Sequence, residues 1–166
     1  MWKQISKHFE KYPKRQKIAQ KMLEYGIKIK NNKLYSGKIE LSDTKISRAL
    51  KTDRRAIQAT IQLIQQKKEL KKIFTKLEPT CNLKEVASEM NWGVIEIIPT
   101  DPSQPGILAE IAKIIADNKI SIRQAIVDDF EIKEQPRLFV ITEKTIPAEL
   151  IPKIKKSKGV KAVLIY

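Results

Sequence analysis

The spacing of hydrophobic positions divides the chain into a mainly helical first part and a second part in which strands and helices alternate. Apolar residues recur at helical spacing over residues 2–12, and again from Pro13 until Gly26. Over residues 27–41 apolar and polar residues alternate between turn signals, which predicts short strands or a hairpin. The basic stretch 28–38 within it is expected to make phosphate contacts as a wing-like hairpin.

Two further helices with a very short turn between them are expected between Ser42 and Gln66. Ser42 is a natural N-cap for the first helix, and Thr52-Asp53 interrupts the pattern and caps the second. The second helix buries isoleucines at i, i+4 and i+7, namely Ile57, Ile61 and Ile64. This order is a helix-turn-helix. The pattern stays helical from Lys67 until Pro79.

The second part begins with a predicted linker helix, because Asn82 and Glu85 have the spacing of a capping box. Strands and helices then follow in the order β-α-β-β-α-β, which is the ferredoxin-like split βαβ. Their sequences are GVIEIIP, GILAEIAKIIADN, ISIRQAIVDD, RLFVITE, PAELIPKIKKS and VKAVLIY. The expected class is α+β, with a (winged) helix-turn-helix domain over 1–79, a linker helix over 80–92 and a ferredoxin-like domain over 93–166.

Charge separates the two parts. The chain has 33 Lys and Arg against 19 Asp and Glu, a net charge of +14. Residues 1–79 hold 17 Lys and 4 Arg against 7 acids, whereas residues 80–166 hold 12 charges of each sign. A general preference for surface lysine is an alternative explanation, but it would raise the net charge of the second part as well. The asymmetry favours a polyanion-binding module joined to a neutral one.

Composition argues against several other functions. The chain has one cysteine, Cys81, and one histidine, His8, so neither a disulfide framework, a His/Cys metal site nor a triad with a histidine base is expected. We expect no metal, no cofactor and no enzymatic activity. No apolar run approaches the roughly 18 residues of a membrane span, and the start lacks the apolar region of a signal peptide. A cytoplasmic protein without membrane association is expected.

The second helix of the helix-turn-helix carries polar residues suited to reading DNA. Arg can bond guanine and Gln can bond adenine in bidentate fashion, and the N-terminal end of such a helix enters the major groove. The end of the first helix and the turn are expected to meet phosphates. The predicted DNA-binding residues are Arg48, Lys51, Thr52, Arg54, Arg55, Gln58 and Gln62. Arg and Gln are also common on the exposed face of any helix. The interpretation of this motif as DNA-binding therefore depends on the positive charge being localised to residues 1–79.

A loop with three prolines between residues 99 and 105 precedes Gly106, which opens the helix GILAEIAKII. Proline rings stiffen the loop, and a glycine at a helix start exposes backbone N–H groups that attract a carboxylate. A nearby acid such as Asp101 can take the ammonium of the same amino acid. The alternative is that Pro-Gly only turns a strand into a helix.

The strand GVIEII, the Pro105-Gly106-Ile107-Leu108 core and the β-α-β-β-α-β order together resemble an ACT domain, an amino-acid-sensing module. With SDTKISRALKTDRRAIQATI and the junction LKEVASEMNWGVIEI, the whole chain resembles prokaryotic, archaeal-type predicted regulators of amino-acid metabolism that join a helix-turn-helix to an ACT domain. The family loop has Asp, one residue, then Pro-Gly. Here three residues separate Asp101 from Pro105, so either Asp101 or Ser103 takes the polar position.

The resemblance implies a homo-oligomer, dimer or tetramer, formed through ACT domains, with an amino acid bound between the loop of one copy and the second strand of a neighbour. The implied ligand-binding residues are Asp101, Ser103, Pro105, Gly106, Ile107, Leu108, Ser121, Ile122 and Gln124. The expected function is an amino-acid-responsive transcriptional regulator of amino-acid metabolism that binds double-stranded DNA. The alternative is an ACT-type regulatory subunit that modulates a metabolic enzyme without binding DNA.

Overall fold

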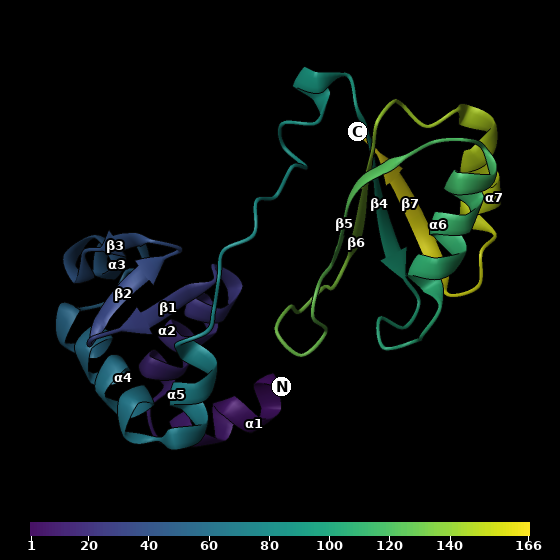
Figure 1. Cartoon of the computed structure of the whole chain (residues 1–166). Coiled ribbons are helices and arrows are strands. Elements are labelled where there is room, and N and C mark those ends of the chain that lie inside the picture. Colours follow the sequence, from purple (N-terminus) through teal and green to yellow (C-terminus); the bar gives the residue numbers. More distant parts are fainter. The chain divides into compact units, whose positions relative to one another are not determined.

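The computed structural model describes residues 1–166 and contains both helices and strands, so the chain is α+β as expected. It forms two compact units, Met1–Cys81 and Asn82–Tyr166 (Figure 1). Each unit has its own sheet, of three and of four strands respectively.

The first unit is mainly helical. Its elements are α1 (Trp2–Ser6), the 3-10 turn η1 (Lys7–Phe9), α2 (Pro13–Glu24), β1 (Ile27–Lys30), β2 (Lys33–Ser36), β3 (Ile39–Leu41), α3 (Asp43–Ala49), α4 (Arg54–Gln66) and α5 (Lys68–Phe74). The predicted helix over 2–12 is divided into α1 and η1, and Lys67, in an extended conformation, separates α4 from α5.

The core of the first unit lies where α2 and α4 pack together. The predicted stripe of Ile57, Ile61 and Ile64 is buried, and Ile18 and Met22 of α2 are buried as well. Such burial of side chains is the main source of stability for helices of this length, since isolated helices of about a dozen residues are marginal in water.

The three strands of the first unit form an antiparallel sheet in the order β1-β2-β3. Asn31 and Asn32 connect β1 to β2 with positive φ angles of 49° and 60°, as in a tight hairpin turn. Gly26, at φ +60°, precedes the sheet, and a Cβ there would collide with the backbone of Glu78. The glycine thus allows the segment after α5 to pass close to the start of β1.

The second unit has the predicted β-α-β-β-α-β order. Its elements are β4 (Gly93–Pro99), α6 (Ile107–Asp117), β5 (Ile122–Val127), β6 (Leu138–Thr142), the 3-10 turn η3 (Ala148–Leu150), α7 (Ile151–Lys155) and β7 (Val160–Ile165). The sheet is antiparallel throughout, in the order β5-β6-β4-β7. Helices α6 and α7 cover one face of it (Figure 1).

The register of the strands shows which residues of this sheet face the core under the helices and which lie on the opposite face, which we call the open face. Ile95 and Ile97 of β4 point to the helices and pack with Ile111 and Ile115 of α6. The open face carries the alternate positions, namely Val94, Glu96, Ile98, Gln124, Ile126, Phe139, Ile141, Ala162, Leu164 and Tyr166.

The predicted linker helix over 80–92 is wrong, because only the 3-10 turn η2 (Ser88–Met90) forms there. The Asn82 side chain accepts from the Lys84 N–H at 3.0 Å, which makes a turn and not a capping box. The Leu83 N–H donates to Gln124 Oε1 at 2.9 Å, and Ala87 is fully buried against Val94 and Ile141. Contacts with the open face therefore override the local helical preference of this segment.

Candidate nucleic-acid interface and ligand pocket

The conformation of the turn between α3 and α4 is determined by the backbone angle of Lys51 and by two hydrogen bonds. Lys51 lies in the left-handed region at φ +49°, which ends α3 and reverses the chain. The Thr52 N–H donates to the Ser47 carbonyl at 2.9 Å, and Asp53 Oδ1 accepts from the Ala56 N–H at 2.7 Å. This cap satisfies one free N–H of α4 and sets its first residue at Arg54.

The polar side of α4, which we call the α4 face, consists of Arg54, Arg55, Gln58 and Gln62. All four residues are exposed, opposite the buried isoleucines. Gln58 Nε2 donates to Asp43 Oδ2 of α3 at 3.2 Å, an exposed contact that holds the first turns of the two helices together. The predicted readout residues therefore share one accessible surface.

The cations around the turn have no acidic partners. Arg48, Lys51, Arg54 and Arg55 are exposed and form no ion pair. Four of the seven acids of the first unit are paired elsewhere, in Lys21–Glu24, Lys28–Glu78, Lys33–Glu40 and His8–Glu69. Asp43 and Asp53 lie near the turn, where they accept hydrogen bonds from Gln58 and Ala56. The positive charge at the turn and the start of α4 is therefore not neutralised by ion pairs.

The hairpin over 28–38 lies away from that surface. A hollow of about 470 Å³, the hairpin hollow, is lined by Lys28, Ile29, Lys30, Asn31, Asn32, Gln65, Lys71 and Thr75. Gln65 is ten residues beyond Arg55, or about 15 Å along the helix axis. The hairpin tip thus lines the same hollow as the C-terminal end of α4, and Lys28 is paired with Glu78. The geometry does not support a wing beside the readout residues.

In the second unit, the proline loop folds on itself at Asp101. Asp101 Oδ1 accepts from the Ser103 hydroxyl at 2.7 Å and from its N–H at 2.9 Å. These two bonds hold the pKa of the Asp101 carboxyl below its ordinary value, and the bond from the Ser103 hydroxyl has the larger effect. Both residues are exposed, so the carboxylate is committed to the turn and faces solvent.

Gly106 begins α6 in a conformation that disfavours side chains, at φ +96°. An added Cβ would meet nothing within 4 Å, so the glycine is needed for its backbone angle and not for space. No side chain caps the helix, which leaves its first N–H groups open to a ligand.

A pocket of about 130 Å³, the loop pocket, lies beside this helix start. Its walls are Pro99, Pro102, Gln104, Gly106, Ile107, Leu108, Val127, Asp128, Pro136, Arg137 and Leu138. Of the predicted ligand residues, Gly106, Ile107 and Leu108 line it, whereas Asp101, Ser103 and Pro105 do not.

The predicted opposite wall, Ser121, Ile122 and Gln124, is not part of the pocket within one copy of the chain. These residues lie at or just before the N-terminal end of β5, whereas the pocket uses Val127, the last residue of β5, and Asp128 after it. Ser121 is bonded to Glu143, and Gln124 to Leu83. Their predicted contact with a neighbouring copy stays a prediction.

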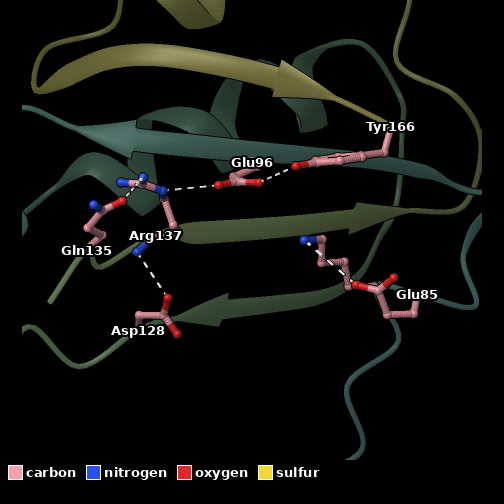
Figure 2. Close-up of polar contacts among 7 residues, drawn as sticks. Glu85, Glu96, Asp128, Gln135, Arg137 and Tyr166 are labelled. Atoms are coloured by element: carbon pink, nitrogen blue, oxygen red, sulfur yellow. Dashed lines mark hydrogen bonds and ion pairs between the residues drawn. The ribbon is translucent and has the colours of Figure 1, made fainter. Parts of the chain in front are cut away.

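Arg137 connects the loop pocket to the open face of the sheet (Figure 2). Its backbone N–H donates to Asp128 Oδ2 at 3.1 Å, and its Nε donates to Glu96 Oε1 at 3.1 Å. The other oxygen of Glu96 accepts from the Tyr166 hydroxyl at 2.6 Å, which raises the pKa of that phenol. Asp128 and Arg137 were missed by sequence reasoning, because only the pairing of β5 with β6 brings them to the loop.

No three His, Cys, Asp or Glu residues are grouped so that they can hold a metal ion. No helix combines the length and the apolar character that crossing a bilayer requires.

Comparisons with known proteins give weak similarities. No protein-family model matches the chain, and no curated protein matches it in sequence. Among solved structures, a transcriptional regulator has 15% identity over 75% of this chain and 78% of that chain, with a TM-score of 0.31. A transcriptional regulatory protein of the ASNC family from Pyrococcus furiosus has 13% identity over 76% of this chain and 77% of that chain, with a TM-score of 0.24. Scores at this level do not identify a shared fold.

Proposed function

We propose that the protein is a DNA-binding transcriptional regulator that responds to an amino acid and has no catalytic activity of its own. The observation that carries the proposal is the α4 face. It presents two arginines and two glutamines to solvent at the start of a capped helix, next to cations without acidic partners.

In this proposal the α4 face enters the major groove. Arg54 and Arg55 contact guanine, and Gln58 and Gln62 contact adenine, since these side chains match the hydrogen-bonding edges of those bases. Arg48 and Lys51 contact phosphates at the end of α3 and in the turn, and position the helix without reading sequence. Thr52, also predicted from the sequence, is left out, because its hydroxyl is buried and its N–H donates to Ser47.

The second unit is proposed to be an ACT-type sensor of amino-acid metabolism. The loop pocket supports this role, since it combines apolar walls with Asp128 and the uncapped start of α6. The helix start suits a carboxylate, and Asp128 suits an ammonium group. Pairing of two such units would place two α4 helices on a two-half-site operator, and the ligand would act by favouring one arrangement of the pair.

A salt titration on duplex DNA tests DNA binding against the alternative of a regulatory subunit for an enzyme. With about six phosphate contacts, the logarithm of the association constant should fall with the logarithm of salt concentration with a slope near −5. Arg55→Ala should reduce the preference between duplex sequences, whereas Lys51→Ala should weaken all duplexes alike. A flat salt dependence supports the enzyme-subunit alternative.

A thermal-shift screen against the twenty amino acids tests the sensor. A hit is then measured on Asp128→Asn and on Asp101→Asn, each of which removes the carboxylate charge and keeps one acceptor oxygen. Loss of the shift in Asp128→Asn alone assigns ammonium binding to the loop pocket. Loss of the shift in Asp101→Asn alone assigns ammonium binding to Asp101, as the family resemblance implies.

A further inference from the structure

We propose that α2 contributes a second row of phosphate contacts to the duplex, through a hollow that it forms with the α3–α4 turn. This inference rests on the proposed DNA binding and adds residues that neither the sequence motif nor the α4 face includes.

The hollow, which we call the α2 hollow, has a volume of about 420 Å³. It is lined by Lys14, Lys17, Ile18, Lys21 and Tyr25 from α2 and its C-cap, and by Ala49, Leu50, Lys51 and Thr52 from the end of α3 and the turn. One side is therefore a lysine-bearing helix, and the other is the turn already assigned to phosphate binding.

The lysines of α2 stand on a single face of the helix. Lys14, Lys17 and Lys21 are spaced i, i+3 and i+7, so their side chains lie above one another toward the hollow. Lys21 is neutralised by Glu24, which accepts from its Nζ at 2.6 Å. Lys14 and Lys17 are exposed and have no acidic partner.

Lys14 also connects the α2 hollow to the start of the α4 face. A neighbouring hollow is lined by Tyr12, Pro13, Lys14, Arg15, Asp53, Arg55, Ala56 and Ala59. The same lysine thus lies beside both the turn and the first residues of α4. Positive charge without ion pairs extends from Arg55 and Lys51 over Lys14 to Lys17, and the one acid in the two linings is Asp53, which caps α4.

A duplex backbone is the occupant that fits this arrangement. Packed helices lie about 8–10 Å apart between their axes, while the major groove is about 12 Å wide. With α4 in the groove, a neighbouring helix therefore lies over the bordering strand. Lys14 and Lys17 are one helical turn apart, about 4.5 Å in axial rise, and can reach phosphates of the same strand together with Lys51.

The test measures duplex affinity by fluorescence anisotropy over a range of salt concentrations for the full chain and three double variants. Lys14→Ala/Lys17→Ala removes the proposed contacts, and Lys14→Arg/Lys17→Arg keeps the charges. Lys30→Ala/Lys71→Ala is the matched control, because it removes the same charge from the lysine-lined hairpin hollow at the other end of α4. Lys14, Lys17 and Lys71 are exposed helical positions, where alanine maintains helix propensity, and Lys30 is the exposed last residue of β1. Circular dichroism verifies folding of each variant.

Removing Lys14 and Lys17 should lower the magnitude of the salt slope by about 2 and the affinity by roughly 60-fold at 0.1 M salt, since each phosphate contact contributes about 0.9 to the slope. The arginine variant should keep the wild-type slope, and the control should change neither quantity. Equal losses in the two alanine variants, or no loss in Lys14→Ala/Lys17→Ala, overturn the inference while leaving the proposed function intact.

Two further outcomes separate the remaining possibilities. If the wild-type protein binds no duplex, the proposed function and the assignment of the α2 hollow both fail. ATP is the probe for a free phosphorylated ligand. A thermal shift with ATP that disappears in Lys14→Ala/Lys17→Ala, with duplex affinity unchanged, would make the hollow a nucleotide site and overturn the duplex assignment.

Discussion

Asp53 Oδ1 accepts the backbone N–H of Ala56 at 2.7 Å, and this bond defines where α4 begins. Replacing Asp53 by alanine should lower the free energy of unfolding by about 1 kcal/mol, the usual cost of losing an N-cap side chain. Urea unfolding of the full chain measures the change.

Asparagine serves as the control for this cap, because its side-chain oxygen can accept the same bond. Asp53→Asn should therefore stay within a few tenths of a kcal/mol of the wild type. Asp43→Ala removes only an exposed contact to Gln58 and should cost less than Asp53→Ala. A larger loss for Asp43→Ala would show that the contact between α3 and α4, and not the cap, fixes the turn.

Lys51 lies in the left-handed region, where a side chain is unfavourable and glycine is not. Lys51→Gly should therefore raise the free energy of unfolding by up to about 1 kcal/mol. The same change should weaken duplex binding and reduce the magnitude of the salt slope by about 1, since one phosphate contact is lost. Lys51→Ala should show the binding loss without the gain in stability, so the pair separates backbone strain from charge.

The second unit contains two glycines whose substitutions should differ in cost. Gly106→Ala introduces a side chain at φ +96° without any collision and should cost about 1–2 kcal/mol. Gly93→Ala places a Cβ 2.6 Å from Thr142 Oγ1 and 2.7 Å from the Lys144 carbonyl, so it should lower the thermal midpoint further. Equal midpoints for the two variants would contradict the packing described around β4.

The hydrogen bond from Tyr166 to Glu96 makes a prediction about alkaline pH. Because the bond raises the pKa of the phenol in the folded state, its stabilising contribution is complete below pH 10 and is lost as pH rises through the folded pKa. The stability of the wild-type protein should therefore decline more steeply above pH 10 than that of Tyr166→Phe. Ultraviolet titration of tyrosinate absorbance should show one phenol with a raised pKa that is missing in Tyr166→Phe.

Periodicity was sufficient to predict the packed elements. The isoleucine stripe of α4 and the short apolar runs of β4 to β7 mark buried positions, so the helix pair and the β-α-β-β-α-β order follow from the sequence. The exposed α4 face was predictable for the same reason, because it is the other side of that stripe.

Features that depend on contacts between distant segments could not be predicted. Residues 82–91 have a helical pattern and a capping-box spacing, but Gln124, 41 positions beyond Leu83, holds the segment against the sheet. Asp128 and Arg137 likewise join the loop pocket only through strand pairing. The position of the 28–38 hairpin beside Gln65 depends on how the sheet packs, which the local pattern does not specify.

The burial of Ala87 has a practical consequence for dividing the protein. Residues 82–91 cover part of the open face of the second sheet, so a fragment starting at Gly93 would leave Val94 and Ile141 uncovered and prone to aggregate. A recombinant C-terminal fragment should start at Asn82, where the compact unit begins.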